Sequence, residues 1–266
     1  MIRKFLIVIS LIIILAGTGI WFLVNAEGND ANTQSLLHMN GADGSTTITD
    51  VAVASSSRTW TAYGNAQIDT AQSKFGGASY LGDGSGDYAS TTDSADWAFG
   101  TGNFTIDFWV RFNIVTAPFS IIHQGATGNV NRWIISGDSN TDDIRFRQWT
   151  AEVLDIDVTI SWTPSINTWY HVALVRTGND FMWFIDGVQT GTTVTDASAV
   201  NDHTGPFLIG ADGWSQTPPS ADFNGWLDEF RVSKGIARWT ANFTPPTCEY
   251  DTGGACSSGV VAPKMQ

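Results

Sequence analysis

The sequence predicts an all-β fold, a two-sheet antiparallel sandwich that follows an N-terminal apolar export or anchor helix. Residues 104–112 (FTIDFWVRF) alternate strictly, as a strand with one face in a core does. The apolar row is Phe104, Ile106, Phe108, Val110 and Phe112. Composition agrees, because 27 Gly and only four Glu favour turns over helices. We therefore expect residues 104–112 to be a central strand of the sandwich.

Length and charge narrow the class further. A chain of 266 residues fits one β sandwich, since such domains commonly use roughly 200 to 250 residues. The formal net charge of −13 gives a surface that repels phosphate backbones, which argues against nucleic acid as a partner.

The N-terminus has the pattern of an export segment. Residues 5–24 are apolar apart from two hydroxyl side chains and follow the basic pair Arg3 and Lys4. A helix of this length reaches roughly 30 Å, enough to cross a bilayer. Residues 24–26 (VNA) suit a small-residue cleavage site. We interpret residues 1–26 as a signal peptide, with a membrane anchor as the alternative; either way the acidic remainder is secreted or lies at the cell surface.

Turn residues divide the remainder into short strands. Residues 93–99 fit one helical turn capped by Asp93 or Ser94. Residues 177–180 and the pair at 186–187 (DG) are typical of hairpin turns. Strands are expected at 34–40, 46–54, 58–69, 79–81, 88–90, 104–112, 119–124, 132–136, 143–149, 153–160, 169–176, 181–186, 207–210 and 226–232.

Seven short segments occur in the order found in a known family. They are 36–41 (LLHMNG), 74–80 (KFGGASY), 82–88 (GDGSGDY), 104–112, 168–173 (TWYHVA), 185–187 (IDG) and 227–232 (LDEFRV). These segments resemble the laminin-G-like jelly roll of the concanavalin A-like lectin and glucanase superfamily, which also includes the pentraxins. The resemblance implies two curved antiparallel sheets, which the alternation indicates independently.

The chain then divides into four parts. They are residues 1–26 (signal peptide or anchor), 27–34 (linker), 35–247 (laminin-G-like domain) and 248–266 (tail). Cys248 and Cys256 lie close together in the tail, and in an oxidising compartment such a pair is expected to form a local disulfide. Closing so short a loop contributes about 2 to 3 kcal/mol and would hold the tail rather than the core.

Catalysis is not expected, and we predict that no residue is catalytic. Hydrolases of the concanavalin A-like superfamily, which this sequence resembles, carry three carboxylates at alternating positions of one strand. The nearest run is 152–157 (EVLDID), where Glu152 falls on the face opposite to Asp155 and Asp157. A retaining glycosidase instead needs two carboxyl groups about 5 to 5.5 Å apart across one sugar. His171 lies inside an apolar strand and is expected to be a buried, hydrogen-bonded residue.

Calcium is the candidate cofactor. The pattern Asp83-x-Ser85-x-Asp87 imitates the first half of an EF-hand loop, although its second half is missing. The resemblance implies a cation held by loop oxygens, with the first strand usually ending in Asp; here that position is Asn40. The expected metal ligands are therefore Asn40, Asp83, Asp87 and Asp228. The alternative is that each of these side chains shapes a turn.

Tryptophan supplies the other recognition chemistry, because the apolar face of a sugar stacks on an indole ring. Trp133, Trp149 and Trp214 lie beside turns or on two-faced strands and are the expected ligand-binding residues. The alternative is that they fill the core, as most Trp in a sandwich does.

These patterns predict an extracytoplasmic, non-catalytic module that binds carbohydrate or a glycoconjugate, with calcium as a candidate cofactor. The alternative is a structural or adhesive cell-surface protein that contacts other proteins. A glycan hydrolase is the least favoured of the three classes. Membrane contact is expected only through residues 5–24, and only if the leader is not cleaved.

Overall fold

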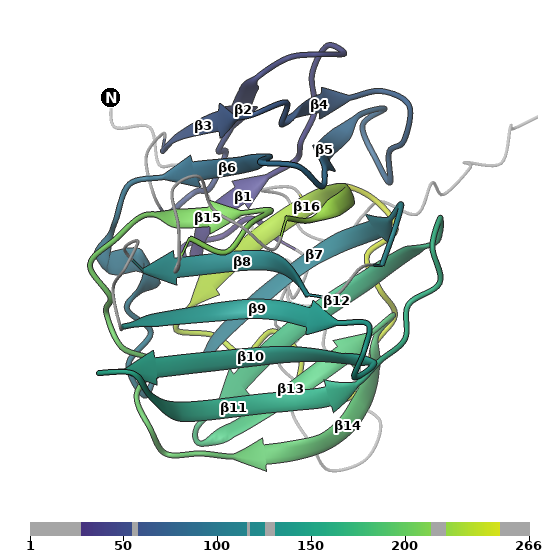
Figure 1. The fold of residues 1–266 in the computed structure, drawn as a ribbon. Helices are drawn as coiled ribbons and strands as arrows, with labels where there is room; N and C mark the ends of the chain where they lie inside the picture. Colours follow the sequence, from purple (N-terminus) through teal and green to yellow (C-terminus); the bar gives the residue numbers. More distant parts are fainter. Residues whose placement is uncertain (1–27, 55–57, 116–117, 126–130, 214–221, 251–266) are drawn as a thin grey trace, which may run out of the picture.

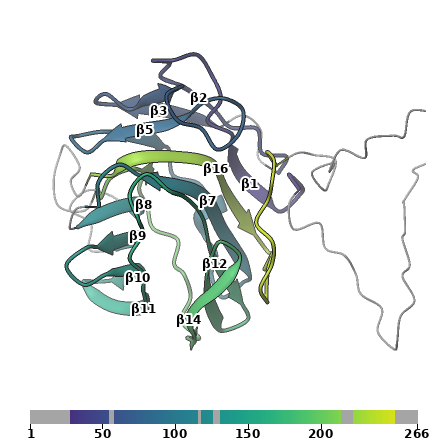
Figure 2. The ribbon, with the colours of Figure 1, turned by 90° about the vertical axis from the view of Figure 1, so that its right-hand side faces the viewer.

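The computed structural model describes residues 28–54, 58–115, 118–125, 131–213 and 222–250. They form two antiparallel sheets of eight strands each, packed face to face (Figures 1 and 2). Sheet A runs in the order β14 (Val188–Thr195), β13 (Asp180–Ile185), β12 (Trp169–Thr177), β7 (Phe104–Phe112), β16 (Asn224–Lys234), β5 (Ser79–Asp83) and β4 (Gln67–Asp69), with β1 (Thr33–Leu37) also paired to β16. Sheet B runs in the order β11 (Val153–Ser161), β10 (Asp143–Thr150), β9 (Arg132–Asp138), β8 (Phe119–Gly125), β15 (Phe207–Ile209), β6 (Tyr88–Thr91), β3 (Thr59–Tyr63) and β2 (Thr47–Thr49). The predicted two-sheet antiparallel sandwich is therefore confirmed.

Helix is nearly absent from the described residues. The 3-10 turn η1 (Ala95–Trp97) is capped by the Ser94 hydroxyl, which accepts a hydrogen bond from the Asp96 backbone N–H, so the predicted helical turn is confirmed. Within the described ranges, no helix is long and apolar enough to cross a membrane. The predicted leader at 1–26 and Cys256 lie outside the described residues, so the export segment and the disulfide stay predictions.

The central position predicted for residues 104–112 is also confirmed. Strand β7 lies between β12 and β16 in the middle of sheet A. Its apolar row is buried in the core between the sheets, where Phe104 meets Phe146 of sheet B with ring centroids 6.2 Å apart. Burying one such side chain contributes about 1.5 to 3 kcal/mol.

The second face of β7 is buried as well, which the alternation alone does not predict. The C-terminal segment, residues 235–250, runs along the outside of sheet A (Figure 2). Its Trp239 and Phe243 rings stack at 4.1 Å and pack over Ala173 and Phe184 of the sheet. This segment therefore covers the outer face of sheet A at β12 and β13.

A buried ionic cluster holds the C-terminal segment down. Arg231 of β16 donates two hydrogen bonds to Asp107 of β7, at 3.0 and 3.2 Å, and both side chains are fully buried. Tyr250 donates its hydroxyl proton to Asp107, and His171 Nε2 lies 3.2 Å from the same hydroxyl oxygen. Burial opposes ionisation of Asp107, but Arg231 and His171 lower its pKa to about 2. The buried, hydrogen-bonded role predicted for His171 is confirmed.

The sandwich closes at the edge formed by β14. The predicted turn at Asp186 and Gly187 is confirmed, since both residues have positive φ, 49° and 75°, as a tight two-residue hairpin requires. It leads into β14, a polar strand that the sequence pattern does not predict. Strand β14 lies against β11 of sheet B, where Gly191, with φ of 73°, leaves room for Ile160.

Replacing Asp107 by Asn should destabilise the fold strongly, because the Arg231 charge would stay buried without its carboxylate. We expect a loss of about 3 to 5 kcal/mol in the free energy of unfolding, measured by urea denaturation. The matched control is Asp157→Asn, which breaks an exposed ion pair with Arg147 at 3.0 Å and should cost less than about 1 kcal/mol.

The wild-type protein should also lose stability in acid. The pKa of Asp107 falls from 3.8 to about 2 on folding, so its contribution to the free energy of unfolding is complete above pH 4 and disappears as the pH falls toward 2.

For the two substitutions, equal losses in the free energy of unfolding for Asp107→Asn and Asp157→Asn would contradict a supporting role for the buried pair.

Candidate functional site

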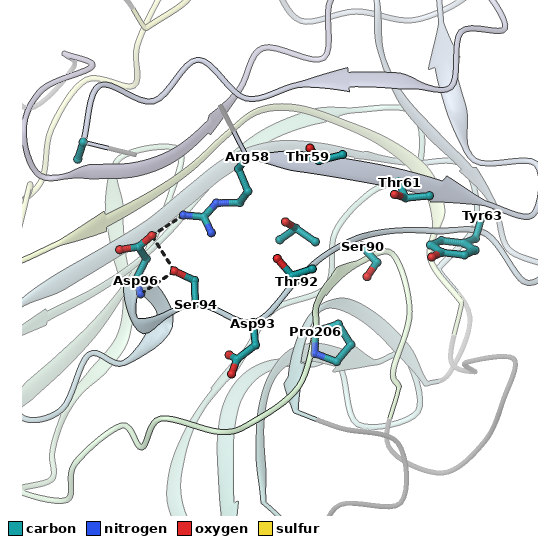
Figure 3. Close-up of a pocket in the computed structure, with 12 residues that line it drawn as sticks. Arg58, Thr59, Thr61, Tyr63, Ser90, Thr92, Asp93, Ser94, Asp96 and Pro206 are labelled. Carbon is teal, nitrogen blue, oxygen red and sulfur yellow. Dashed lines mark hydrogen bonds and ion pairs between the residues drawn. The ribbon is translucent and has the colours of Figure 1, made fainter. Parts of the chain in front are cut away.

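The candidate site is a groove on the outer face of sheet B, over β3 and β6. Strand β3 alternates, so that Trp60 enters the core while Thr59 and Thr61 point outward. On β6, Ser90 lies directly across from Thr61. Because these outward side chains are short, they leave a hollow on the sheet surface between larger side chains such as Tyr63 and Arg58. The volume of the hollow is about 740 Å³ (Figure 3).

An aromatic pair stands at one end of the groove. Tyr63 follows the two threonines on β3 and stacks on Tyr88 of β6, with ring centroids 4.5 Å apart and an interplanar angle of 8°. Tyr63 lines the groove and is 44 % exposed. The underlying Tyr88 ring therefore fixes an exposed aromatic face at the end of a hydroxyl-lined floor.

Charged side chains stand at the opposite end, on the segment around η1. Arg58 Nη2 lies 2.5 Å from Asp96 Oδ2, and the guanidinium stacks 4.4 Å above the buried Trp97 ring. Ser94 donates its hydroxyl proton to the same Asp96 carboxylate at 2.9 Å. Figure 3 shows this pair at the end of the groove away from Tyr63, with Asp93 lying between the pair and Pro206.

The predicted binding role of Trp133 is wrong, because its side chain is fully buried. It packs in the core against Phe99, Phe146 and Phe207. The residue lies on the inward face of β9, and the nearby turn that favoured exposure does not change that face.

The other two predicted tryptophans lie away from the groove or outside the described residues. Trp149 is partly exposed on the outer face of sheet B, where the Arg132 guanidinium stacks 4.0 Å from its ring. Four strand spacings, about 19 Å, separate its strand from β6. Trp214 lies outside the described residues.

The four predicted calcium ligands do not form one cluster. Asp83 and Asp87 lie together, and the Asp83 backbone N–H donates to Asp87 at 2.8 Å. Asn224 of β16 pairs with Asp83, and Asp228 lies four residues farther along the same strand. That spacing places Asp228 about 13 Å from Asn224. Asn40 donates instead to Glu249 at 2.8 Å. Among the described residues, no group of three or more His, Cys, Asp or Glu side chains is placed to hold a metal ion.

Asp228 has a structural role in the observed arrangement. It occupies a register break of β16, where the next residue, Glu229, has a φ of 48°. Its carboxyl group accepts hydrogen bonds from the backbone N–H groups of Lys74, Phe75 and Glu229, at 2.7, 3.0 and 2.9 Å. Burial raises the pKa of Asp228 to about 8. The turn-shaping alternative therefore describes Asp228 better than metal ligation.

The carboxylates at 152–157 lie on the β10–β11 hairpin. Glu152 lies at the tip of the β10–β11 hairpin with a φ of 66°. Asp155 accepts hydrogen bonds from Gln148 and Thr150 at 3.1 and 2.8 Å. Asp155 thus links the two strands of the hairpin beside its turn.

Sequence reasoning missed the groove because it searched for tryptophan. The available signal was the alternation of residues 59–63 (TWTAY), which exposes two hydroxyl groups and a tyrosine. Residues 88–91 (YAST) show the same pattern. Their pairing joins segments about 27 residues apart in the chain, and no local pattern indicates that they are neighbours.

The closed two-sheet sandwich with a hollowed outer face defines a jelly-roll domain of the lectin-like type. The family model described as the Concanavalin A-like lectin/glucanases superfamily matches residues 83–238, more than half of the sequence. The chain therefore belongs to that superfamily, and the resemblance found in the sequence is confirmed. No curated protein matches the chain significantly in sequence.

Solved structures share the fold at low sequence identity. The binding domain of botulinum neurotoxin DC in complex with SialylT matches with a TM-score of 0.55 and 17 % identity, over 79 % of this chain and 50 % of that one. Domain 4 of AbnA, an extracellular arabinanase from Geobacillus stearothermophilus in complex with arabinotriose, matches with a TM-score of 0.55 and 15 % identity, over 77 % of this chain and 95 % of that one. The chain thus spans about half the length of the neurotoxin chains it matches.

The burial of Trp133 leads to a direct test. Trp133→Ala should cost about 3 to 5 kcal/mol in the free energy of unfolding, because it leaves a large cavity between the sheets. Trp149→Ala, on the outer face, should cost clearly less, and comparison of the two urea midpoints checks the assignment. A larger loss in the free energy of unfolding for Trp149→Ala than for Trp133→Ala would contradict the assignment of Trp133 to the core.

Proposed function

We propose that this protein is a non-catalytic carbohydrate-binding module that acts outside the cytoplasm, secreted or at the cell surface. Its partner would be a glycan or a surface glycoconjugate, held in the groove over β3 and β6. The observation that carries the proposal is an open floor of hydroxyl groups that ends on the exposed ring of Tyr63.

The chemistry of the groove suits a sugar in two ways. A pyranose or furanose ring has an apolar face that packs on an aromatic ring, and Tyr63 offers such a face with Tyr88 behind it. Sugar hydroxyl groups donate and accept hydrogen bonds, and the hydroxyls of Thr59, Thr61 and Ser90 can do both. An open groove, rather than a closed cavity, admits an internal segment of a longer glycan.

The comparisons support the same class of function. The neurotoxin binding domain and the arabinanase domain have this fold, and those structures are complexes with SialylT and with arabinotriose. Covering of sheet A by residues 235–250 also favours sheet B as the binding surface. The apolar segment at 5–24 supports the extracytoplasmic location.

A protein-contacting surface role is the second candidate. Val153 and Leu154, at the start of the edge strand β11, are 65 % and 42 % exposed. Adjacent exposed apolar side chains on an edge strand favour contact with another protein. This surface lies at the opposite edge of sheet B from the groove, so the two roles are separable by mutation.

Removing the aromatic ring should weaken glycan binding. We expect Tyr63→Ala to lose about tenfold in affinity, because one aromatic contact is worth up to about 1.5 kcal/mol. Tyr63→Phe keeps the ring and should stay close to wild type, and Trp149→Ala should be unchanged. Glycan-array screening followed by calorimetry on a bound glycan measures all three. Loss of glycan binding in Trp149→Ala alone would show that the binding site lies on β10 and not over β3 and β6.

Calcium assistance remains a proposal that rests on the sequence. Asp83 and Asp87 are the two expected ligands that lie side by side. Bound calcium should raise the melting temperature in calcium chloride relative to chelator, by about 2 to 4 °C for each kcal/mol of binding linkage. Asp87→Ala should abolish that rise. An unchanged wild-type melting temperature would contradict the calcium proposal and leave the sugar-binding proposal intact.

A further inference from the structure

We infer that the groove selects neutral glycans and discriminates against acidic ones such as sialylated or uronic acid sugars. This inference rests on the proposed function and specifies its ligand class. The inference comes from the charged residues that line the groove. The one lining cation among the described residues, Arg58, is already paired with protein carboxylates, whereas the Asp93 carboxylate also lines the groove.

Arg58 is the one cation among the described residues that line the groove. Its Nη2 lies 2.5 Å from Asp96, and its Nε lies 3.7 Å from the buried Asp50. The guanidinium carbon of Arg58 lies over the Trp97 ring, 4.4 Å from its centroid, and the Arg58 side chain is only 9 % exposed. Two protein carboxylates thus balance this charge, so Arg58 does not present the bidentate, solvent-facing fork that recognises a ligand carboxylate.

Asp93 carries the charge that a ligand meets. It is exposed, lines the groove and is directed away from the Arg58–Asp96 pair (Figure 3). Its carboxylate accepts a long hydrogen bond, 3.5 Å, from the neutral amide of Gln124. Lys234 also reaches η1, where it donates to the Ala95 carbonyl at 2.7 Å, but it is not among the described residues that line the groove.

Among the described lining residues the balance is therefore two carboxylates, Asp93 and Asp96, against one guanidinium, on a protein whose net charge is −13. A sugar hydroxyl gains from this arrangement, because a hydrogen bond donated to a carboxylate is stronger than one donated to a neutral acceptor. A sugar carboxylate brought near Asp93 is repelled, by about tenfold in affinity at a separation of roughly 6 Å and an effective dielectric constant of about 40. Added salt should reduce this difference.

The test uses the full chain on an array of matched glycan pairs, each a neutral oligosaccharide and its sialylated or uronic acid counterpart. We expect the neutral members to bind about tenfold more tightly at low salt. Asp93→Asn should narrow that difference severalfold. Asp157→Asn removes the same charge from the same face, about 24 Å away on β11, and should leave the difference unchanged.

Each result decides between the two proposals. Equal or tighter binding of the acidic members, or no effect of Asp93→Asn beyond that of Asp157→Asn, overturns this inference while the proposed function stands. Binding of neither member of any pair overturns the proposed function, and this inference with it. Retained melting temperatures of both variants separate a change in selectivity from a loss of fold.

Discussion

The buried pair of Asp107 and Arg231 is the interaction on which the rest of the structure depends. It joins two neighbouring strands at the centre of sheet A and lies outside the apolar core, on the face that would otherwise meet solvent. A buried charge pair is tolerated only when its remaining hydrogen-bonding groups are satisfied, and here Tyr250 and the Gly28 carbonyl are among the groups that satisfy them. The pair therefore ties both ends of the described chain to the central strand.

That constraint determines which surface is available for binding. Residues 235–250 cover sheet A with Trp239 and Phe243, while β3 and β6 of sheet B keep a bare outer face. Short hydroxyl side chains on those two strands make the floor of the groove, and the stacked Tyr63 and Tyr88 rings end it. The fold thus leaves the outer face of sheet B open over β3 and β6 and covers the outer face of sheet A with its own C-terminal segment.

Local features of the sequence predict the structure correctly where a single segment decides the outcome. The alternation of residues 104–112 predicts a central strand, the Asp186-Gly187 pair predicts a hairpin, and Ser94 predicts a cap. Exposure is harder to predict from one segment, because it depends on which neighbours cover a residue. Trp133 lies beside a turn and is buried, whereas β14 (VQTGTTVT) is a strand with no apolar alternation, since its partner β13 and the facing β11 hold it in place.

The sequence by itself determined the fold class, the superfamily and the approximate positions of most strands along the chain, because period-2 alternation and turn residues act over a few neighbouring positions. Only the tertiary structure decided that the second face of β7 is covered, that the expected calcium ligands stand apart, and that Thr61, Ser90 and Tyr63 share a groove. Those outcomes arise from strand pairing and packing between distant segments. The energy of such contacts depends on the whole arrangement and leaves no pattern within one segment.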